Sequence, residues 1–322
     1  MPTLKEIKGR ISSVKSTLKI TAAMKLVSSA KLRKAQKATE AMRPYEARLQ
    51  AMLATVGGTL STDSASMVHG LAKNGIPSTD RASTVHGPVM LGSDRASLPS
   101  AIVAIASNSS LCGGFNANAI AKVRSVRQAG DVVYSVGRKM ADAMRKDGFP
   151  SPEDFTALAD HPTYAPAAAL VEKLMADVHD GKFSKVVLVY THFVSTAKQV
   201  PTVEELMASA TPAAEENYFS QGFAKNQFSP AIAMPTQQAD AILEPSRKEL
   251  LEALEPKLFK LKLYAALLDS AAAEHAARTV AMQTATDNGE NLLQELTLQY
   301  NKGRQQKITS EILDLAGGQM QE

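Results

Sequence analysis

Cysteine and long apolar segments are what this 322-residue sequence has least of. Its single cysteine excludes an internal disulfide, and no spacing of cysteine and histidine resembles a zinc site. The longest strongly apolar stretch has about six residues, 101–106, whereas a membrane-spanning helix needs about 20. The first six residues have no apolar segment after their charges, so we expect no signal peptide. These absences exclude a disulfide-rich secreted scaffold and an integral membrane protein.

What the sequence does have is enough apolar residues for a core and an uneven distribution of charge. Hydrophobic residues make up 44% and charged residues 21%, which excludes a wholly disordered chain. Residues 1–50 carry twelve Lys or Arg against three Glu, a net charge of +9, and the total of +4 leaves −5 for the rest. A basic arm on a slightly acidic body indicates either an anionic partner along that arm or a solvated helix face.

Residues 3–56 are predicted to form one long helix. Thr3 and Glu6 have the spacing of a capping box. Apolar residues then recur at alternating intervals of four and three, as in the seam of a coiled coil. The seam begins with Ile7, Ile11, Val14 and Leu18 and continues with the smaller set Ala22, Ala23, Met24, Val27 and Ala30. We expect Pro44 to kink the helix rather than end it, and Gly57 and Gly58 to end it.

A second long helix is predicted over residues 246–316, with leucine and alanine at the same intervals. Pro256 and the pair Asn288-Gly289 are its weak points, and Gly317-Gly318 ends it. At about 1.5 Å per residue the two helices are roughly 80 and 105 Å long, far longer than a globular core requires. Neither helix can bury its seam alone, so we expect the two to pair as an antiparallel coiled coil.

Between these helices, strand and helix patterns alternate, which predicts a central Rossmann-like α/β domain with a mostly parallel sheet covered on both faces. The fold class is therefore α/β, with a long coiled coil added to it. The stretch 209–235 is rich in Ala, Pro and Asn and is expected to be a loop. The expected strands are 101–106, 131–136, 185–190, 198–206 and 240–244, and the expected helices are 116–128, 138–146 and 165–180.

Residues 59–99 contain a duplicated sequence of low complexity. Eight of the ten positions in residues 61–70 recur in 78–87, and 93–97 are a partial third copy. The repeat is too short and too polar for a solenoid, so we expect a surface loop in which His69 and His86 bind no metal. The predicted divisions are residues 1–58 (coiled-coil helix), 59–99 (loop insertion), 100–245 (α/β domain) and 246–322 (coiled-coil helix).

No catalytic pattern stands out in the sequence. The Gly-rich residues 111–115 follow a predicted strand, but no phosphate-binding loop motif or dinucleotide fingerprint occurs anywhere. We therefore expect Gly113 and Gly114 to form a tight strand-to-helix turn and Cys112 to be a small buried thiol rather than a nucleophile. His192 follows a strand, where catalytic residues do occur, but it stands alone. These observations favour an interaction protein, without cofactor or metal, over an enzyme.

Three longer segments resemble one known family. Residues 20–36 (ITAAMKLVSSAKLRKAQ), 274–288 (EHAARTVAMQTATDN) and 300–312 (YNKGRQQKITSEI) resemble the hallmark sequences of the gamma subunit of the F-type ATP synthase, in the same order. The family usually has Ser-Asp-Arg-Gly-Leu-Cys-Gly-Gly where this chain has residues 107–114, SNSSLCGG. Loss of Asp, Arg and Gly there calls into question any ionic contact or positive-φ turn at this loop. The 59–99 segment is also longer than the family's usual connection.

The resemblance implies a rotor. In this family the paired terminal helices turn inside a hexamer of alternating alpha and beta subunits, and the middle domain sits against the epsilon subunit and the membrane ring of c subunits. Catalysis belongs to beta, and rotation couples proton flow to ATP synthesis or hydrolysis. The resemblance thus implies a non-catalytic subunit, peripheral to the membrane on the cytoplasmic face of the bacterial inner membrane, with no nucleic-acid partner.

The resemblance also implies which residues meet the hexamer. Met24 and Lys25 match family positions that face an acidic loop of beta, and Lys31, Arg33 and Lys34 extend the basic surface beside them. The residues that match the family's C-terminal contacts to the beta catch loops are Arg304, Gln305, Thr309 and Glu311. Two other hypotheses stay open from the residues alone. One is a coiled-coil scaffold or nucleic-acid-binding protein that uses the basic arm, and the other is an α/β enzyme with helical arms.

Overall fold

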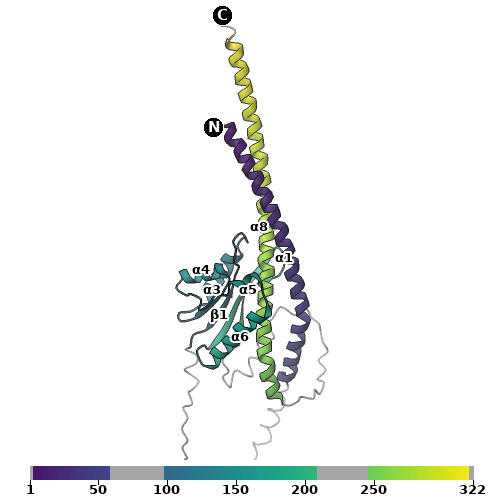
Figure 1. Ribbon diagram of the computed structural model, residues 1–322, viewed down its shortest axis with the longest axis vertical. Coiled ribbons are helices and arrows are strands. Elements are labelled where there is room, and N and C mark those ends of the chain that lie inside the picture. Colours follow the sequence, from purple (N-terminus) through teal and green to yellow (C-terminus); the bar gives the residue numbers. More distant parts are fainter. Residues whose placement is uncertain (1–2, 59–97, 209–245, 319–322) are drawn as a thin grey trace, which may run out of the picture.

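Two long helices lie side by side along most of the molecule, and a small α/β unit lies against one side of the lower half (Figure 1). The computed structural model describes residues 3–58, 98–208 and 246–318. The N-terminal helix α1 spans Leu4–Gly58 and the C-terminal helix α8 spans Arg247–Gly318. The start of α1 and the end of α8 lie at the same end of the molecule, and α8 extends well beyond the start of α1 (Figure 1).

Both long helices have the bounds that the sequence predicted, within two residues. The capping box at the start of α1 is formed, since Thr3 N donates to Glu6 Oε2 at 3.0 Å and Glu6 N donates to Thr3 Oγ1 at 3.3 Å. Helix α1 continues through Pro44, and α8 continues through Pro256 and through Gly289. The predicted strand 240–244, the loop 209–235 and the insertion 59–99, with its histidines, lie outside the described residues.

The two helices pair in antiparallel fashion in one register. Thr286 Oγ1 donates to Thr21 Oγ1 at 3.0 Å, and a Cβ placed on Gly289 or on Gly303 would meet Cδ2 of Leu18 or of Leu4. The two residue numbers in each of these three pairs add to 307, which fixes the register over residues 4–21 of α1. Residue 304 is therefore level with the first residues of α1, and everything after it lies beyond the coiled coil.

The predicted seam is wrong in one stretch of α1. Thr21, Ser28 and Leu32 are the buried residues there, whereas Ala22 and Ala23 are exposed. Val27 and Ala30, which the spacing also assigned to the seam, are exposed as well. Because most side chains in residues 21–30 are small, apolar spacing alone does not say which of them face α8. The small residues on the outside keep this part of the coiled coil narrow.

The sheet has four strands in the order β2-β1-β3-β4. Strand β1 (Ala101–Ile105) pairs in parallel with β2 (Val132–Val136) and with β3 (Lys185–Phe193). Strand β4 (Gln199–Ala208) returns antiparallel along β3, so that a short turn links the two. The mostly parallel sheet is confirmed, and a hairpin forms one of its edges.

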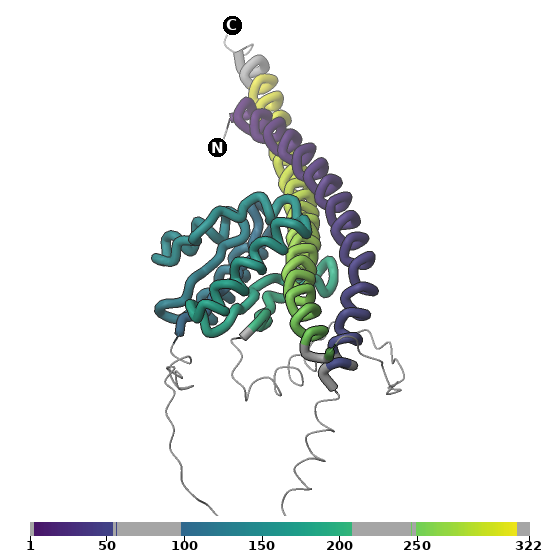
Figure 2. Tube along the Cα trace, turned by 60° about the horizontal axis from the view of Figure 1, so that its bottom comes forward, coloured from purple at the N-terminus to yellow at the C-terminus, as the bar shows by residue number. Residues whose placement is uncertain are grey.

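Both faces of the sheet are covered, as predicted, but one cover is the C-terminal helix itself. Helices α3 (Phe115–Val126) and α4 (Arg138–Lys146) cover one face. Helix α6 (Tyr164–His179) and the middle of α8 cover the other, together with the short α5 (Thr156–Asp160), which the sequence analysis did not predict. The α8 residues in that core are Leu263, Ala266 and Leu267. We call the sheet with α3–α6 the head, and it shares α8 with the coiled coil (Figure 2).

Candidate functional site

The nine predicted contact residues fall into two groups that lie far apart along the two long helices. Met24 and Lys25 are half-buried, and the other three of the first group are exposed along α1. All four of the second group are exposed on α8, beyond the start of α1. In the observed register residue 304 is level with residue 3, so about 20 residues, roughly 30 Å of helix, separate the two groups. The structure therefore gives two candidate contact surfaces rather than one site.

The first surface combines positive charge with exposed apolar side chains. Ile20, Leu26 and Val27 are 60%, 72% and 57% exposed and lie beside Lys25 in sequence on α1. Val280 of α8 is also exposed, and in the observed register it lies level with Val27. Exposed apolar groups next to basic ones are typical of a surface that binds a partner. Sequence reasoning missed these apolar residues because it assigned Val27 to the coiled-coil seam.

The second surface is a single unaccompanied helix. Ile308, Ile312 and Leu313 are exposed on it, next to the predicted contacts. Glu311 pairs with Lys307 at 3.5 Å, and both side chains are more than 60% exposed. Such a pair contributes at most about 1 kcal/mol, so it leaves Glu311 available to a partner. Thr309 donates its hydroxyl to the carbonyl of Gln305 at 2.9 Å, as threonine commonly does within a helix.

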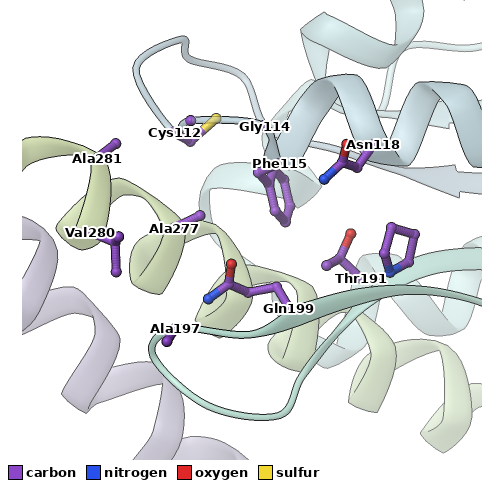
Figure 3. A pocket seen from close by; sticks show the side chains of 12 residues that line it. Cys112, Gly114, Phe115, Asn118, Thr191, Ala197, Gln199, Ala277, Val280 and Ala281 are labelled. Carbon is purple, nitrogen blue, oxygen red and sulfur yellow. The ribbon is translucent and has the colours of Figure 1, made fainter. Parts of the chain in front are cut away.

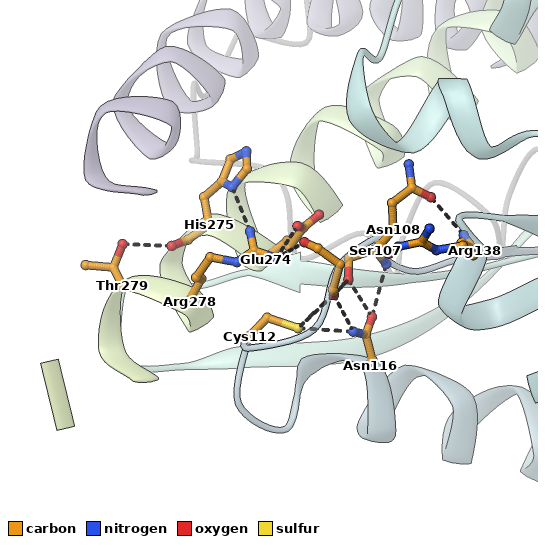
Figure 4. A network of polar contacts seen from close by, with 10 residues as sticks. Ser107, Asn108, Cys112, Asn116, Arg138, Glu274, His275, Arg278 and Thr279 are labelled. Atoms are coloured by element: carbon orange, nitrogen blue, oxygen red, sulfur yellow. Dashed lines mark hydrogen bonds and ion pairs between the residues drawn. The ribbon is translucent and has the colours of Figure 1, made fainter. Parts of the chain in front are cut away.

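A third cluster lies where the head meets α8, at the loop in which the sequence departs from the family it resembles (Figure 4). Arg278 of α8 pairs with Glu274 at 2.7 Å and donates to Ser109 Oγ at 2.7 Å. Asn108 Oδ1 accepts from the backbone N–H of Arg138 at 2.8 Å. The loop therefore does make a contact to a cation, through a hydroxyl rather than through a carboxylate.

The turn in this loop does not need the missing glycine. Leu111 has φ of 66° and Gly113 has φ of 57°, so the left-handed positions are 111 and 113 and not 110. Cys112 is buried, and its Sγ lies 3.1 Å from Asn116 Nδ2. Gly114 then begins α3, which confirms the tight strand-to-helix turn that the sequence predicted.

Burial shifts the pKa of two α8 side chains beside this loop. Burial, and then the charges of Arg278 and Lys31, lower the pKa of His275 to about 4, so His275 is neutral near pH 7. Burial raises the pKa of Glu274, and Arg278 opposes that shift. Lys31, one of the predicted contacts, therefore acts electrostatically on α8 of its own chain.

A cavity of about 190 Å³ lies between the head and α8 (Figure 3). Its walls include Phe115 and Asn118 of α3, Thr191 and Gln199 of the hairpin, and Val280 of α8. No charged side chain lines it. In the part of the chain that the structure describes, no group of three or more metal-binding side chains occurs. No helix of residues 3–58, 98–208 and 246–318 is both long and apolar enough to cross a membrane.

Comparison with known proteins decides the family. The model of the family described as ATP synthase matches residues 3–320. The ATP synthase gamma chain of Phocaeicola vulgatus is 43% identical, over 99% of this chain and all of that protein. That of Bacteroides fragilis is 41% identical over the same shares. The chain belongs to the ATP synthase gamma chain family. These relatives give no support to the hypothesis of a scaffold or nucleic-acid-binding protein.

Solved structures of more distant members show the same fold. The rotor of the Euglena gracilis mitochondrial ATP synthase in rotational state 1 has a TM-score of 0.60 at 17% identity, over 95% of this chain and 98% of that one. A chain in the OSCP/F1/c-ring assembly of the same enzyme has a TM-score of 0.62 at 18% identity, over 98% and 93%. The predicted fold, a coiled coil of the terminal helices with a central α/β unit, is confirmed.

Proposed function

We propose that this chain is the central-stalk rotor of a proton-translocating F-type ATP synthase, in which it couples proton flow to ATP synthesis or hydrolysis at beta-subunit sites. The observation that carries the proposal is the path of α8. One uninterrupted helix forms part of the head's core and half of the coiled coil, and then continues as the single helix beyond α1. Because no flexible joint divides α8, a turn imposed on the head reaches the far end of the molecule.

The proposed partners on the coiled coil are the alpha and beta subunits. Lys31, Arg33 and Lys34 are exposed, Met24 and Lys25 are half-buried, and we propose that they meet an acidic loop of beta. Arg304, Gln305, Thr309 and Glu311 are exposed on the single helix, and we propose that they meet the beta catch loops. Each contact is made by one asymmetric shaft to three like subunits, so it biases their nucleotide affinities differently.

The proposal places the head against the epsilon subunit and the c-ring. The subunit would then be peripheral, at the cytoplasmic face of the bacterial inner membrane. We further propose that residues 1–58 and 246–322 form the shaft, that 100–245 form the head, and that 59–99 are an insertion beside it. The chain itself would not catalyse, because its buried titratable groups serve contacts within the chain, such as Glu274 with Arg278.

Reconstitution with alpha and beta subunits tests the proposal. With the hexamer fixed to a surface and a bead attached to the head, addition of ATP should produce rotation in one direction. Hydrolysis without rotation, or failure of the chain to join the hexamer, would contradict the rotor function. The isolated chain should show no ATP binding at micromolar concentration in calorimetry, and such binding would contradict the proposal that it is non-catalytic.

A further inference from the structure

The end of strand β3 reaches both helices of the coiled coil. Phe193, its last residue, packs against a cluster of Leu32 from α1 with Ala272 and Ala276 from α8. It also packs against a second cluster that includes Phe115 of the head. One side chain of the head thus packs against a cluster to which both α1 and α8 contribute, and against a cluster shared by the head and α8. Figure 2 shows the turn after β3 on the side of α8 that faces α1.

The position of Phe193 is fixed by a buried carboxylate on α8. Asp269 accepts from the backbone N–H of Phe193 at 3.3 Å and from His192 Nδ1 at 2.7 Å, and its side chain is only 6% exposed. Burial raises the pKa of Asp269, and the bonds from His192 and Phe193 oppose that shift. A buried carboxylate with two donors holds both of them in place, because leaving it unpaired is costly.

A second group of polar contacts joins the head to α8. Lys262 of α8 pairs with Glu204 of β4 at 3.1 Å, and Tyr190 donates its hydroxyl to Glu204 at 3.4 Å. Arg43 and Glu46 of α1 line a small cavity beside these residues. Phe193 adds an apolar contact between the head and the coiled coil at the level of Leu32.

We propose that Phe193 couples the head to both helices of the shaft and that Asp269 is its positioning residue. This inference rests on the proposed rotor function. Torque applied to the head passes directly into α8, and α1 follows only as far as the coiled coil resists twisting. A rigid ring seated against both helices adds resistance there, because close-packed interiors transmit strain with little compression. Phe193 thereby makes the two helices turn together at the level where they leave the head.

The torsional stiffness of the rotor in the assembled complex tests this inference. The hexamer is fixed to a surface and a bead is attached to the head. While the complex waits for ATP, the angular variance of the bead measures the torsional compliance of the rotor between the hexamer and the bead. We expect Phe193→Ala to raise that variance on the order of twofold, since a well-packed ring is lost at the junction. Hydrolysis at saturating ATP should stay unchanged, because Phe193 lies within the rotor.

Val194→Ala is the matched control. Val194 follows Phe193 in the chain, is half exposed, and belongs to neither cluster of packed residues. It should leave the variance at the wild-type value, and Phe193→Leu should restore most of the stiffness. Equal variance in Phe193→Ala and wild type would overturn the inference. Absence of rotation in the wild-type complex would instead overturn the proposed rotor function.

A second measurement addresses Asp269 and does not depend on whether Phe193→Ala assembles. In Asp269→Asn the amide keeps the shape of the carboxylate but loses its charge, so its bonds to His192 and to Phe193 N weaken. Hydrogen exchange at Phe193 N–H in the assembled complex should then be about tenfold faster, as a loss of about 1.4 kcal/mol in opening free energy gives. The bead's angular variance should rise as well. Faster exchange without a rise in variance would show that Asp269 serves stability alone.

Discussion

At the scale of single residues, the ion pair of Arg278 and Glu274 within α8 is a buried contact beside the head. Both side chains are only 11% exposed, and Arg278 also donates to Ser109. Arg278→Ala leaves the Glu274 carboxylate buried and unpaired, so we expect a loss of about 3–5 kcal/mol in unfolding free energy, measured by urea denaturation. Arg145→Ala breaks an exposed pair with Asp142 and should cost under about 1 kcal/mol. Similar losses in the two variants would contradict this account.

Also at this scale, His275 gives the stability of the protein a defined dependence on pH. Its folded-state pKa is about 4, below the ordinary value of 6.5, so the unfolded chain takes up a proton first as the pH falls. The unfolding free energy is therefore not reduced by His275 above pH 6.5, and it falls as the pH drops from 6.5 to 4. Because each unit of pKa difference corresponds to about 1.4 kcal/mol, the total loss is up to about 3 kcal/mol. In His275→Gln the unfolding free energy, measured by urea denaturation, should fall by about 3 kcal/mol less between pH 6.5 and 4 than in the wild type. Parallel curves for the two proteins would exclude this role.

At the scale of the elements, the sequence predicted the helices and strands whose apolar residues recur at a regular interval. Both long helices, four strands and three head helices were found because their apolar residues recur at helical or strand-like intervals, within a few residues of the observed bounds. Helix α5 has five residues, too few to show a period. The packing of the head on α8 does have a signal in the sequence. Leu263 and Leu267 add apolar positions outside the seam, which makes this stretch of α8 apolar on more than one face.

The contact surfaces were less predictable than the helices that carry them. Their residue types came from the family resemblance, but their separation depends on the register of the coiled coil. That register is set by single close contacts such as Thr21 with Thr286, which no periodicity reveals. In residues 21–30 small side chains occupy both faces of α1, so the pattern could not tell the buried Ser28 from the exposed Val27.

The register itself is testable at Gly289. An added Cβ would lie 2.7 Å from Cδ2 of Leu18, so Gly289→Ala should destabilise the protein although alanine favours helix by about 1 kcal/mol. Gly9→Ala is the control, because nothing lies within 4 Å of its Cβ, and it should stabilise by about 0.5–1 kcal/mol. Combining Gly289→Ala with Leu18→Ala should recover part of the loss, as measured by urea midpoints in a double-mutant cycle. Additive effects would mean that the two residues do not meet.

At the scale of the whole molecule, two parts of α8 have two different tasks: one part stabilises the fold, and the other is exposed to a partner. Residues up to about 303 of α8 bury apolar surface against α1 or the head, and the exposed single helix beyond them buries little within the chain. The part that contributes least to the stability of the fold carries Ile308, Ile312 and Leu313 on its surface. An unpaired helix with exposed apolar residues is retained for a partner rather than for the fold.

Removal of residues 304–322 separates these two tasks. The truncated chain should unfold within about 0.5 kcal/mol of the full chain, because surface segments without packing contribute little to stability. Its affinity for the alpha–beta hexamer should fall, since Arg304, Gln305, Thr309 and Glu311 are lost with the apolar residues beside them. The matched comparison is the full chain with those four residues changed to alanine, which keeps Ile308, Ile312 and Leu313. If affinity falls in the truncation but not in the alanine variant, the apolar side chains hold the hexamer and the four polar residues do not. An unchanged affinity in both would remove this end of α8 from the proposed contacts and leave the surface around Lys25 to bind the hexamer.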